Sequence, residues 1–507
     1  MAKGQRNTSK GQDVAGAERE LKFEVPAAAW DGLRKEMKAA GAQAADLHAI
    51  YHDTADGLLA RAKLSLRLRR EHGHWVQTLK APGGQVFERV EDEVPLGPVR
   101  RGKPPVLDPG RHTPRAAREA LRQALGLDQD AAWPALPPAF EVKVRRHAVR
   151  VHAGRSVVEL ALDEGQVLAA GCSRPIRELE LELVEGSMQD LLVLARQWRS
   201  RGRLCLSTAS KAARGHLLVA GELYGPAVGA SAPRLPDKPG MGEFAAAVLD
   251  ACMDQVVGNA GEIAAGSQSE EHVHQLRVGI RRLRTALREL PGFAGERARR
   301  EPILLEVFRA LGERRDRSHV LQAVAPLVEA AGGKPLRIPR AFQEGADPAD
   351  LVRADAFQDA VLGLILRAQQ ERSAAGGRVR KTVRSHLREL HEQVTQDGKR
   401  FPKLDQDRQH RVRKRLKRLR YLGEFAAPLY PAGAVRRSMA RIKPAQDALG
   451  QFNDEIMAQG LFEELAQSDP DALFAVHWLQ ERRPAQAKAC RKTLQRLAAA
   501  RPFWEKA

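Results

Sequence analysis

The sequence predicts two domains of different fold class: an N-terminal domain built on a closed antiparallel β-sheet, and an all-helical C-terminal domain. Three observations predict this. Apolar and charged residues alternate over residues 17–99 and 139–184, the pattern of strands with one apolar and one polar face. Helical periodicity dominates from residue 241 to the end of the chain. Between them, residues 225–240 hold four prolines and three glycines, a composition typical of a linker.

The domain boundaries follow from these changes of pattern. A chain of 507 residues is too long for one ordinary hydrophobic core. The sequence predicts a disordered N-terminus at 1–16, a β-rich domain at 17–220, a linker at 221–240 and a helical domain at 241–507. Within the helical domain we expect two repeats, at about 241–330 and 351–507.

Composition narrows the class of protein and of partner. Lys plus Arg number 83 against 63 Asp plus Glu, a net charge of +20 that favours a polyanionic partner. The four cysteines form no CxxC pair, which excludes a disulfide scaffold and a zinc finger. The N-terminus lacks the apolar segment of a signal peptide, and no run of about 18 apolar residues occurs, so we expect a cytoplasmic protein without membrane contact.

The predicted strands carry their charges on one face. In the segment RELELELV, Glu178, Glu180 and Glu182 alternate with leucines, and three stacked carboxylates repel one another unless a cation lies among them. Mg²⁺ and Mn²⁺ favour such oxygen ligands. Arg67 and Arg69 share one face of LSLRLRR and require an anion. A sheet whose polar face simply meets water is the alternative, but a closed sheet with a charged lumen accounts for both signs of charge.

The ordered motifs Glu18-x-Glu20-x-Lys22, Tyr51-x-Asp53-Thr54, LSLRLRR, VQTLK, ALDEG, PIRELELEL and SKAARGH resemble those of the CYTH domain, also called the triphosphate tunnel metalloenzymes. The resemblance covers residues 17–220. It implies an eight-stranded antiparallel β-tunnel that binds a triphosphate together with two divalent ions, Mg²⁺ or Mn²⁺.

The resemblance also assigns residues. It implies that the metals are held by Glu18, Glu20, Glu178, Glu180 and Glu182. The phosphate oxygens would be bound by Lys22, Arg67, Arg69, Lys80, Arg89, Arg145 and Lys211. A catalytic role is expected for Lys22, Arg67, Arg69 and Lys80, with Glu159 and Asp163 positioning water or other side chains. The phase of the strand EVKVRR favours Arg145 over Arg146 for the tunnel wall.

Two helices of the C-terminal domain carry a basic stripe beside an apolar one. In HQLRVGIRRLRTALREL the polar stripe comprises His274, Arg277, Arg281, Arg284 and Arg288, at i, i+3, i+7, i+10 and i+14. In HRVRKRLKRLRYLGEF the same phases hold His410, Arg413, Lys417 and Arg420. A similar pair of strings, LGERRD and LGQFND, recurs at nearly the same offset, which indicates an internal duplication into two helical bundles.

A charge stripe on one helix usually means a solvated face, but two stripes facing a shared groove would require a polyanion. These motifs resemble the CHAD domain, the conserved-histidine α-helical domain. The resemblance implies two four-helix bundles, related by a pseudo-twofold repeat, that bind long-chain inorganic polyphosphate through the two stripes. Metal binding by the histidines is less favoured on the sequence itself, because they lack acidic or cysteine neighbours at ligand spacing.

The sequence thus predicts a metal-dependent inorganic triphosphatase, cutting tripolyphosphate to pyrophosphate and phosphate, joined to a polyphosphate-binding domain that could associate with polyphosphate granules. The chain has no GxxxxGK[ST], no GxGxxG after a strand and no HExxH. Three alternatives remain: an organic triphosphate (thiamine triphosphate or a nucleotide) as substrate, with adenylate cyclase activity included; a non-catalytic polyphosphate-granule protein; and nucleic-acid binding, the least favoured.

Overall fold

The computed structural model describes residues 17–83, 88–99, 104–336, 345–374 and 376–505, with the side chains of 17, 314–316 and 318–319 left aside. The predicted disordered N-terminus, 1–16, therefore lies outside the described residues. The chain divides into two compact units, Met1–Pro226 and Ala227–Ala507. The division falls inside the segment predicted as a linker.

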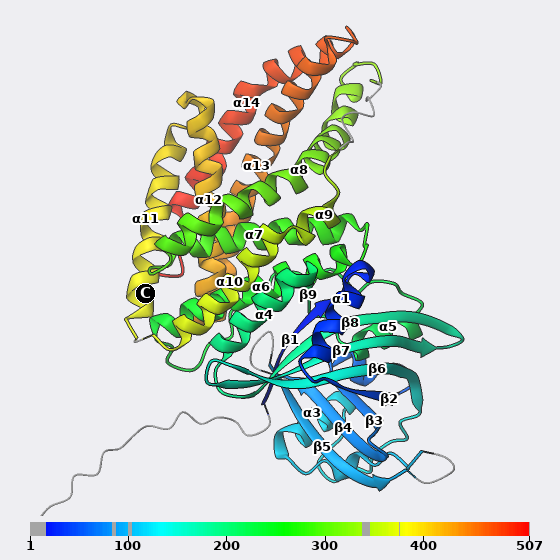
Figure 1. The fold of residues 1–507 in the computed structure, drawn as a ribbon. Coiled ribbons are helices and arrows are strands. Elements are labelled where there is room, and N and C mark those ends of the chain that lie inside the picture. Colours follow the sequence, from blue (N-terminus) through cyan, green and yellow to red (C-terminus); the bar gives the residue numbers. More distant parts are fainter. Residues whose placement is uncertain (1–16, 84–87, 100–103, 337–344, 375, 506–507) are drawn as a thin grey trace, which may run out of the picture. The chain divides into compact units, whose positions relative to one another are not determined.

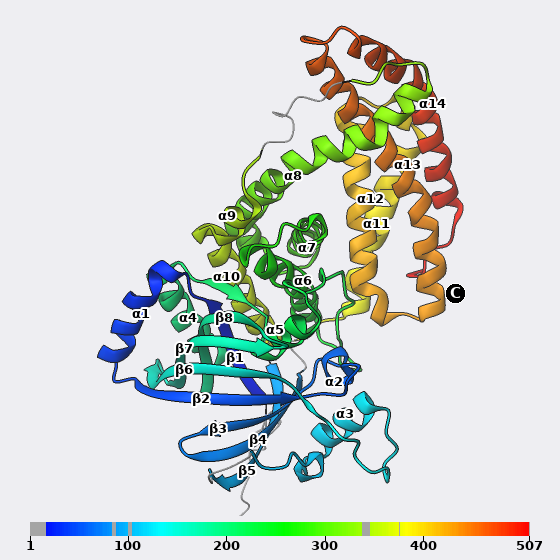
Figure 2. The ribbon, with the colours of Figure 1, turned by 90° about the vertical axis from the view of Figure 1, so that its right-hand side faces the viewer.

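The first unit contains a closed barrel (Figures 1 and 2). Its antiparallel sheet has the strand order β5-β4-β3-β2-β6-β7-β8-β1-β9, and pairing of β5 with β1 closes eight strands into a barrel. The predicted eight-stranded antiparallel tunnel is confirmed, with β9 as an additional short strand beside β1. The strands are β1 (Ala17–Glu24), β2 (Gln43–His52), β3 (Ser65–Glu71), β4 (His74–Pro82), β5 (Glu88–Pro98), β6 (Pro138–Ala153), β7 (Ser156–Ala169), β8 (Cys172–Glu185) and β9 (Cys205–Ser207).

Short helices surround the barrel. They are α1 (Ala27–Ala39), α2 (Leu58–Arg61), α3 (Arg115–Leu125), α4 (Met188–Gly202) and α5 (Lys211–Val219), with the 3₁₀ turn η1 (Pro109–Arg111). Helix α4 begins at an N-cap, Ser187, whose hydroxyl accepts a bond from the Asp190 amide. On β7 and β8 the leucines Leu160 and Leu181 are fully buried, while the carboxylates between them face the lumen. The strand alternation therefore separates the apolar packing of these two strands from a charged interior.

Strand β6 departs from that pattern. Its valines Val142 and Val144 line the lumen and form an apolar cluster with Phe140 and with Ala212 of α5. The interior is therefore apolar where α5 packs against β6 and β7, and charged elsewhere. This arrangement reverses the phase that the charged residues of β6 suggested from the sequence.

The second unit is helical. Its α-helices are α6 (Met241–Ala264), α7 (Glu270–Glu289), α8 (Ala294–Ala330), α9 (Pro348–Arg353), α10 (Asp355–Arg372), α11 (Val379–Lys399), α12 (Gln406–Ala426), α13 (Ala432–Leu465) and α14 (Ala472–Ala499), with 3₁₀ turns η3 (Phe401–Lys403) and η4 (Ala427–Leu429). None of the described helices contains an apolar stretch long enough to cross a bilayer.

The helices form two four-helix bundles, as expected. Helices α6, α7, α10 and the first part of α8 pack together, and α11 to α14 form the second bundle. The starts of α6 and α11, of α7 and α12, and of α8 and α13 lie 138, 136 and 138 residues apart along the chain. Helix α10 packs against α6 and so belongs to the first bundle, whereas the sequence-based division placed it in the second repeat.

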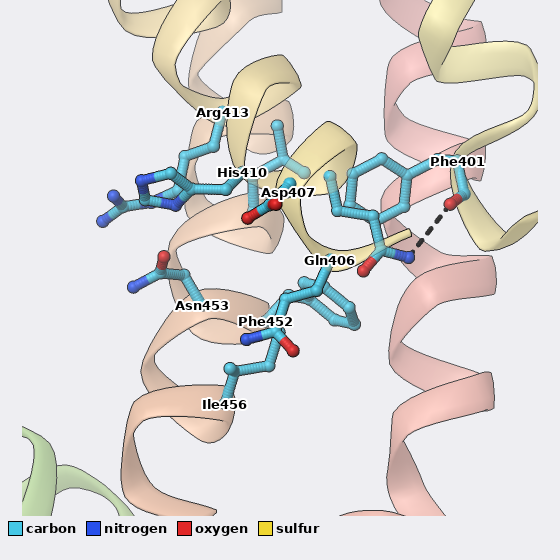
Figure 3. A pocket seen from close by; sticks show the side chains of 10 residues that line it. Phe401, Gln406, Asp407, His410, Arg413, Phe452, Asn453 and Ile456 are labelled. Atoms are coloured by element: carbon cyan, nitrogen blue, oxygen red, sulfur yellow. Dashed lines mark hydrogen bonds between the residues drawn. The ribbon is translucent and has the colours of Figure 1, made fainter. Parts of the chain in front are cut away.

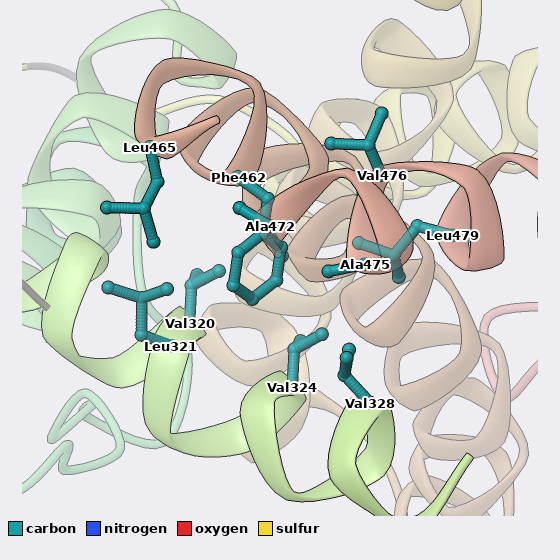
Figure 4. Packing of buried hydrophobic residues seen from close by; sticks show 11 residues of the cluster. Val320, Leu321, Val324, Val328, Phe462, Leu465, Ala472, Ala475, Val476 and Leu479 are labelled. Carbon is teal, nitrogen blue, oxygen red and sulfur yellow. The ribbon is translucent and has the colours of Figure 1, made fainter. Parts of the chain in front are cut away.

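Helix α8 connects the two bundles. Beyond its first part it leaves the first bundle and buries Val320, Val324 and Val328 against Phe462 of α13 and Leu479 of α14 (Figure 4). The apolar stripes predicted on the two basic helices are also buried, with Leu276 and Ile280 of α7 fully enclosed. Each basic stripe therefore borders a packed core and has little freedom to move.

The middle of the predicted linker is fixed to the helical unit. The Asn259 side chain accepts a hydrogen bond from the Val228 amide and donates one to the Val228 carbonyl oxygen. The buried Arg282 guanidinium donates to the Ser231 carbonyl oxygen at 2.6 Å. These contacts make the segment part of the surface of the first bundle.

Candidate functional site

The barrel encloses a cavity of about 290 Å³ whose wall carries equal numbers of both charges among the described residues. The eight cationic side chains are Lys22, Arg67, Arg69, Lys80, Arg89, Arg146, Arg150 and Lys211. The eight carboxylates are Glu18, Glu20, Glu71, Glu91, Glu93, Glu159, Glu180 and Glu182. Most of the residues predicted for the triphosphate and metal sites thus meet in this one cavity.

At one part of the wall the carboxylates are fully engaged by protein cations. Glu180 lies 3.0 Å from Lys22 Nζ, 3.0 Å from Lys211 Nζ and 2.6 Å from the Arg146 guanidinium. Burial opposes ionisation of Glu180, but Lys211, Lys22 and Arg146 outweigh it and hold its pKa well below the ordinary value. Glu180 is therefore ionised in the free protein, and the three neighbouring cations balance its negative charge.

Asp163 and Glu178 lie behind this wall and are fully buried. Asp163 accepts two hydrogen bonds from Arg146, and Glu178 is bound by Lys211 and Arg214. The oxygens of Asp163, Glu178 and Glu180 lie within 4.8 Å of one another, close enough to share a cation. In the free protein Asp163 thus binds Arg146 and Lys211, and Glu178 binds Lys211, while the role of Glu178 as a metal ligand stays a prediction.

A second group of carboxylates has fewer cations among it. Glu18 receives Lys80 Nζ at 2.7 Å, and the same ammonium lies 3.0 Å from Glu91. Burial raises the pKa of Glu18 against the pull of Lys80, and Glu91 adds to the rise. Burial, followed by the neighbouring Glu18, raises the pKa of Glu182 to about 7. Crowded carboxylates with this deficit of positive charge fit a divalent cation, because Mg²⁺ and Mn²⁺ take oxygen ligands.

The arginines of β3 and β5 complete the wall. Arg67 donates to the Tyr51 hydroxyl at 3.3 Å and lies 3.7 Å from Glu91. Arg69 contacts Glu71 at 2.7 Å and Glu93 at 3.2 Å. Arg89 lies 3.8 Å from Glu20, and Glu159 pairs with Arg150 at 3.1 Å. Each cation therefore faces the lumen with a carboxylate at its side.

Arg145 is the one predicted phosphate ligand that the structure places outside the cavity. Its side chain is exposed on the outer face of β6, and Arg146 lines the lumen instead. The prediction was wrong because it assumed that the valines of β6 lie outside the barrel, whereas they pack inward against α5. Arg146, two residues beyond Val144, therefore points inward with them.

Sequence reasoning missed several wall residues. Glu91 and Glu93 share the inward face of β5 with Arg89, so their alternation could have assigned them. Arg150 follows from Arg146 by the same period once the phase of β6 is known. Tyr51 lines the cavity at the YxDT motif, and its ring stacks on Phe140 at 4.6 Å.

The helical unit holds a second cavity, of about 580 Å³, between α7, α8, α12 and α13. Its cationic lining among the described residues is Arg277, Arg281, Arg284, Arg288, Arg413, Lys414, Lys417 and Arg418, with His410 beside them. Its described carboxylates are Glu301 and Asp454. The two basic stripes therefore meet across one cavity, with far fewer carboxylates than in the barrel.

Two members of the predicted stripes lie elsewhere. His274 is one turn before Arg277 and is not part of the lining. Arg420 is also outside it, where its guanidinium donates to Glu424 and to Gln446. Lys414 and Arg418 line the cavity instead: at about 100° per residue they lie about 40° and 80° to one side of His410 on α12, whereas Arg420 lies about 80° to the other side. The side of α12 that faces the cavity is therefore rotated by part of a turn from the stripe that the sequence predicted.

A smaller pocket of about 110 Å³ adjoins this cavity between α12 and α13 (Figure 3). His410, Arg413 and Asn453 belong to the lining of both. Phe401 and Phe452 form its apolar side, with their rings edge to face at 5.4 Å. Burial, with Lys414 and Arg413 nearby, lowers the pKa of His410, so the imidazole is neutral at pH 7.

Comparisons with known proteins agree with this division. The CYTH domain family matches residues 16–216, and the CHAD domain family matches residues 247–463. An inorganic triphosphatase of Haemophilus influenzae is 32% identical over 171 residues, which make up 33% of this chain and 44% of that protein. The match thus spans less than half the length of that relative.

Solved structures are similar to each part. The CHAD domain from the plant Ricinus communis aligns with 54% of this chain and 98% of its own at 25% identity, with a TM-score of 0.45. A Hippeastrum protein, described as a putative adenylyl cyclase with a dominant triphosphatase activity, aligns with 41% of this chain and 97% of its own at 21% identity, with a TM-score of 0.29. On the family matches, the chain is a two-domain protein that joins a CYTH domain to a CHAD domain.

Proposed function

We propose that the CYTH domain is a metal-dependent inorganic triphosphatase that hydrolyses tripolyphosphate to pyrophosphate and phosphate. One P–O–P bond is broken by water, and phosphoryl transfer of this kind requires charge neutralisation and positioning more than a protein nucleophile. The observation that carries the proposal is the barrel cavity of about 290 Å³, whose wall holds equal numbers of cations and carboxylates among the described residues.

The cations and the carboxylates of the wall would have different roles. Lys22, Arg67 and Arg89 would bind phosphate oxygens, and the remaining cations of the wall would hold the chain in register. Glu18, Glu20 and Glu182 would hold Mg²⁺ or Mn²⁺, since Glu18 and Glu182 belong to the crowded carboxylates and Glu20 lies as far as 3.9 Å from Lys22 and 3.8 Å from Arg89. When bound, such an ion neutralises phosphate charge and lowers the pKa of coordinated water. Asp163, below the wall, would fix Arg146 and Lys211 in place.

An inorganic chain is favoured over an organic triphosphate by the shortage of aromatic surface. Tyr51 is the aromatic residue of the described lining, and its ring is already stacked on Phe140. A nucleobase or thiazolium ring would therefore find no free stacking platform on the described wall. The homology to an inorganic triphosphatase points to the same substrate.

Phosphate release from tripolyphosphate, thiamine triphosphate and ATP tests the proposal. With the full chain and Mg²⁺ or Mn²⁺, we expect release from tripolyphosphate to exceed the other two by at least about tenfold in kcat/KM, and EDTA to abolish it. Faster release from ATP or thiamine triphosphate would establish the organic alternative. Absence of release from all three would establish a non-catalytic binding protein.

We further propose that the CHAD domain binds long-chain inorganic polyphosphate in the cavity between α7 and α12. Eight cationic side chains and two carboxylates line its described wall, and a polyanion relieves that imbalance. The setting we propose is the cytoplasm, in association with polyphosphate granules. Filter binding of polyphosphate against duplex DNA of equal charge is the test, and preference for DNA at physiological salt would overturn the assignment.

A further inference from the structure

Three carboxylates lie in a row across the neighbouring strands β1, β8 and β7. The strand register places Glu24 directly opposite Glu178, and Glu178 directly opposite Asp163. Like charges in directly opposite positions of neighbouring strands destabilise a sheet. Glu178 and Asp163 are also fully buried, so little water screens their repulsion. The sheet therefore requires cations between these carboxylates.

Helix α5 supplies two such cations, one turn apart. Lys211 lies between Glu178 and Asp163, since its Nζ donates to Glu178 and lies 2.7 Å from Asp163. The Arg214 guanidinium lies between the other two carboxylates, where it donates to Glu178 at 3.1 Å and to Glu24 at 2.7 Å. Negative and positive groups therefore alternate along the row.

The two cations bind different oxygens of the Glu178 carboxylate. Arg214 donates to Oε2 and Lys211 donates to Oε1. The terminal torsion of a glutamate has only broad preferences, so the contact of Arg214 with Oε2 fixes the plane in which Oε1 meets Lys211. Lys211 lines the barrel cavity, whereas Arg214 is not part of the described lining. Arg214 is thus connected to the cavity through Glu178 and Lys211.

The backbone of α5 gives the Arg214 side chain a fixed origin. Ser210 caps the helix, and its hydroxyl oxygen accepts a hydrogen bond from a backbone amide of the first turn. Gly215, the next residue after Arg214, lies against the ring of Phe140 so closely that a Cβ would overlap the ring. The Arg214 side chain itself is almost fully buried. The guanidinium therefore has little freedom to leave the two carboxylates.

We propose that Arg214 is a positioning residue of the barrel site: by binding Glu24 and Glu178 together, it holds Glu178 in the orientation that presents Lys211 to the phosphate chain. This inference rests on the triphosphatase function proposed above, and it adds to that site a residue from outside the described cavity lining. A guanidinium suits the task because its planar fork can donate to two carboxylates at once, whereas an ammonium is a point charge.

Steady-state hydrolysis of tripolyphosphate by variants of the full chain gives the first test. Arg214→Gln removes the charge between the carboxylates, and we expect kcat/KM to fall about 30-fold because Lys211 is displaced. Arg214→Lys returns a positive charge without the fork and should recover kcat/KM to within about fivefold of the wild type. Arg177→Gln is the matched control, since Arg177 precedes Glu178 on β8 but pairs with Glu164 outside the cavity lining. It should stay within about twofold of the wild type.

A double-mutant cycle separates positioning from a purely structural role. Lys211→Gln removes the side chain through which Arg214 would act, so in that background Arg214→Gln should lower kcat/KM by less than about a further threefold. The Tm should fall on Arg214→Gln in both backgrounds, because two carboxylates lose a partner. If Arg214→Gln does not fold, the same cycle is measured with Arg214→Lys, whose loss of turnover should likewise disappear in the Lys211→Gln background.

The outcomes are distinct. An equal factor of loss in the wild-type and Lys211→Gln backgrounds overturns this inference alone, because Arg214 would then act on the fold and not through Lys211. Wild-type turnover of Arg214→Gln overturns it as well. If the wild type itself releases no phosphate from tripolyphosphate, the proposed function fails and this inference fails with it.

Discussion

The barrel cavity and the helical cavity each present eight Lys and Arg side chains from the described residues, but they balance them differently. In the barrel, eight described carboxylates line the same wall as the cations, and Lys80 Nζ lies 2.7 Å from a Glu18 carboxylate oxygen. In the helical cavity the described carboxylates are only Glu301 and Asp454. The same number of cations therefore meets a balanced wall in one domain and an unbalanced wall in the other.

The difference indicates what each cavity can accept. A bare polyanion entering the barrel would have to displace carboxylates from their cations, so a triphosphate with bound divalent ions suits it better, each ion taking carboxylates and the phosphates taking lysines and arginines. The helical cavity has few carboxylates to displace, so a long polyanion can enter without metal. The barrel cavity therefore suits a short, metal-bound ligand in a fixed geometry, whereas the helical cavity suits any long ligand of high negative charge.

The largest expected effect tests the role of the barrel carboxylates. Glu20→Gln keeps the shape of the side chain but removes a negative oxygen, and divalent cations bind neutral amides poorly. We expect tripolyphosphate turnover to fall about 1,000-fold. Glu164→Gln is the control, because Glu164 follows the buried Asp163 but is partly exposed and pairs with Arg177 outside the cavity lining. Near-normal turnover of Glu20→Gln at saturating metal would show that the carboxylate balance is not catalytic.

The next test compares neighbouring arginines on β6. Arg146→Gln leaves Asp163 and Glu180 without their guanidinium partner, so we expect about a 100-fold loss of turnover and a lower Tm. Arg145→Gln alters an exposed side chain and should stay within about twofold of the wild type in turnover and near it in Tm. A larger loss of turnover for Arg145→Gln than for Arg146→Gln would mean that Arg145 faces the lumen, as the sequence first predicted.

The helical cavity is tested by charge reversal. Arg281→Glu with Arg413→Glu should weaken polyphosphate binding by about 100-fold and reduce the salt dependence by about two ions. The control reverses Arg411 and Arg420. Both are exposed side chains of α12 and lie outside the cavity lining. Equal losses in both double variants would mean that binding follows net charge and not the cavity.

The smallest expected effect concerns Glu301, one of the two described carboxylates of the helical cavity. Glu301 binds Arg284 at 3.1 Å, Arg288 at 3.2 Å and Arg297 at 2.8 Å. Glu301→Gln should release these arginines to the ligand and raise polyphosphate affinity about fivefold. Titration at fixed salt measures this effect. A decrease in affinity would instead show that Glu301 positions the arginines for binding.

The sequence by itself determined the fold classes and most of the barrel site. Period-2 alternation put Glu18, Glu20 and Lys22 on one face of a strand, and a closed sheet turns such faces into a lumen. Helical periodicity separated the apolar and basic stripes of α7, and Leu276 and Ile280 are buried as expected. The repeated basic pattern also indicated the duplication, because equivalent helices begin 136 to 138 residues apart.

Only the tertiary structure decided the phase of β6 and the boundaries of the helical cavity. Alternation shows that the residues of β6 divide into two faces, but packing of Val142 and Val144 against α5 decides which face is inside, and so selects Arg146 over Arg145. Likewise, a helical stripe fixes angles around α12, but the positions of α8 and α13 decide that Lys414 and Arg418 face the cavity and Arg420 does not. Local periodicity specifies relative directions along one element, whereas the environment that each direction meets depends on contacts between elements distant in sequence.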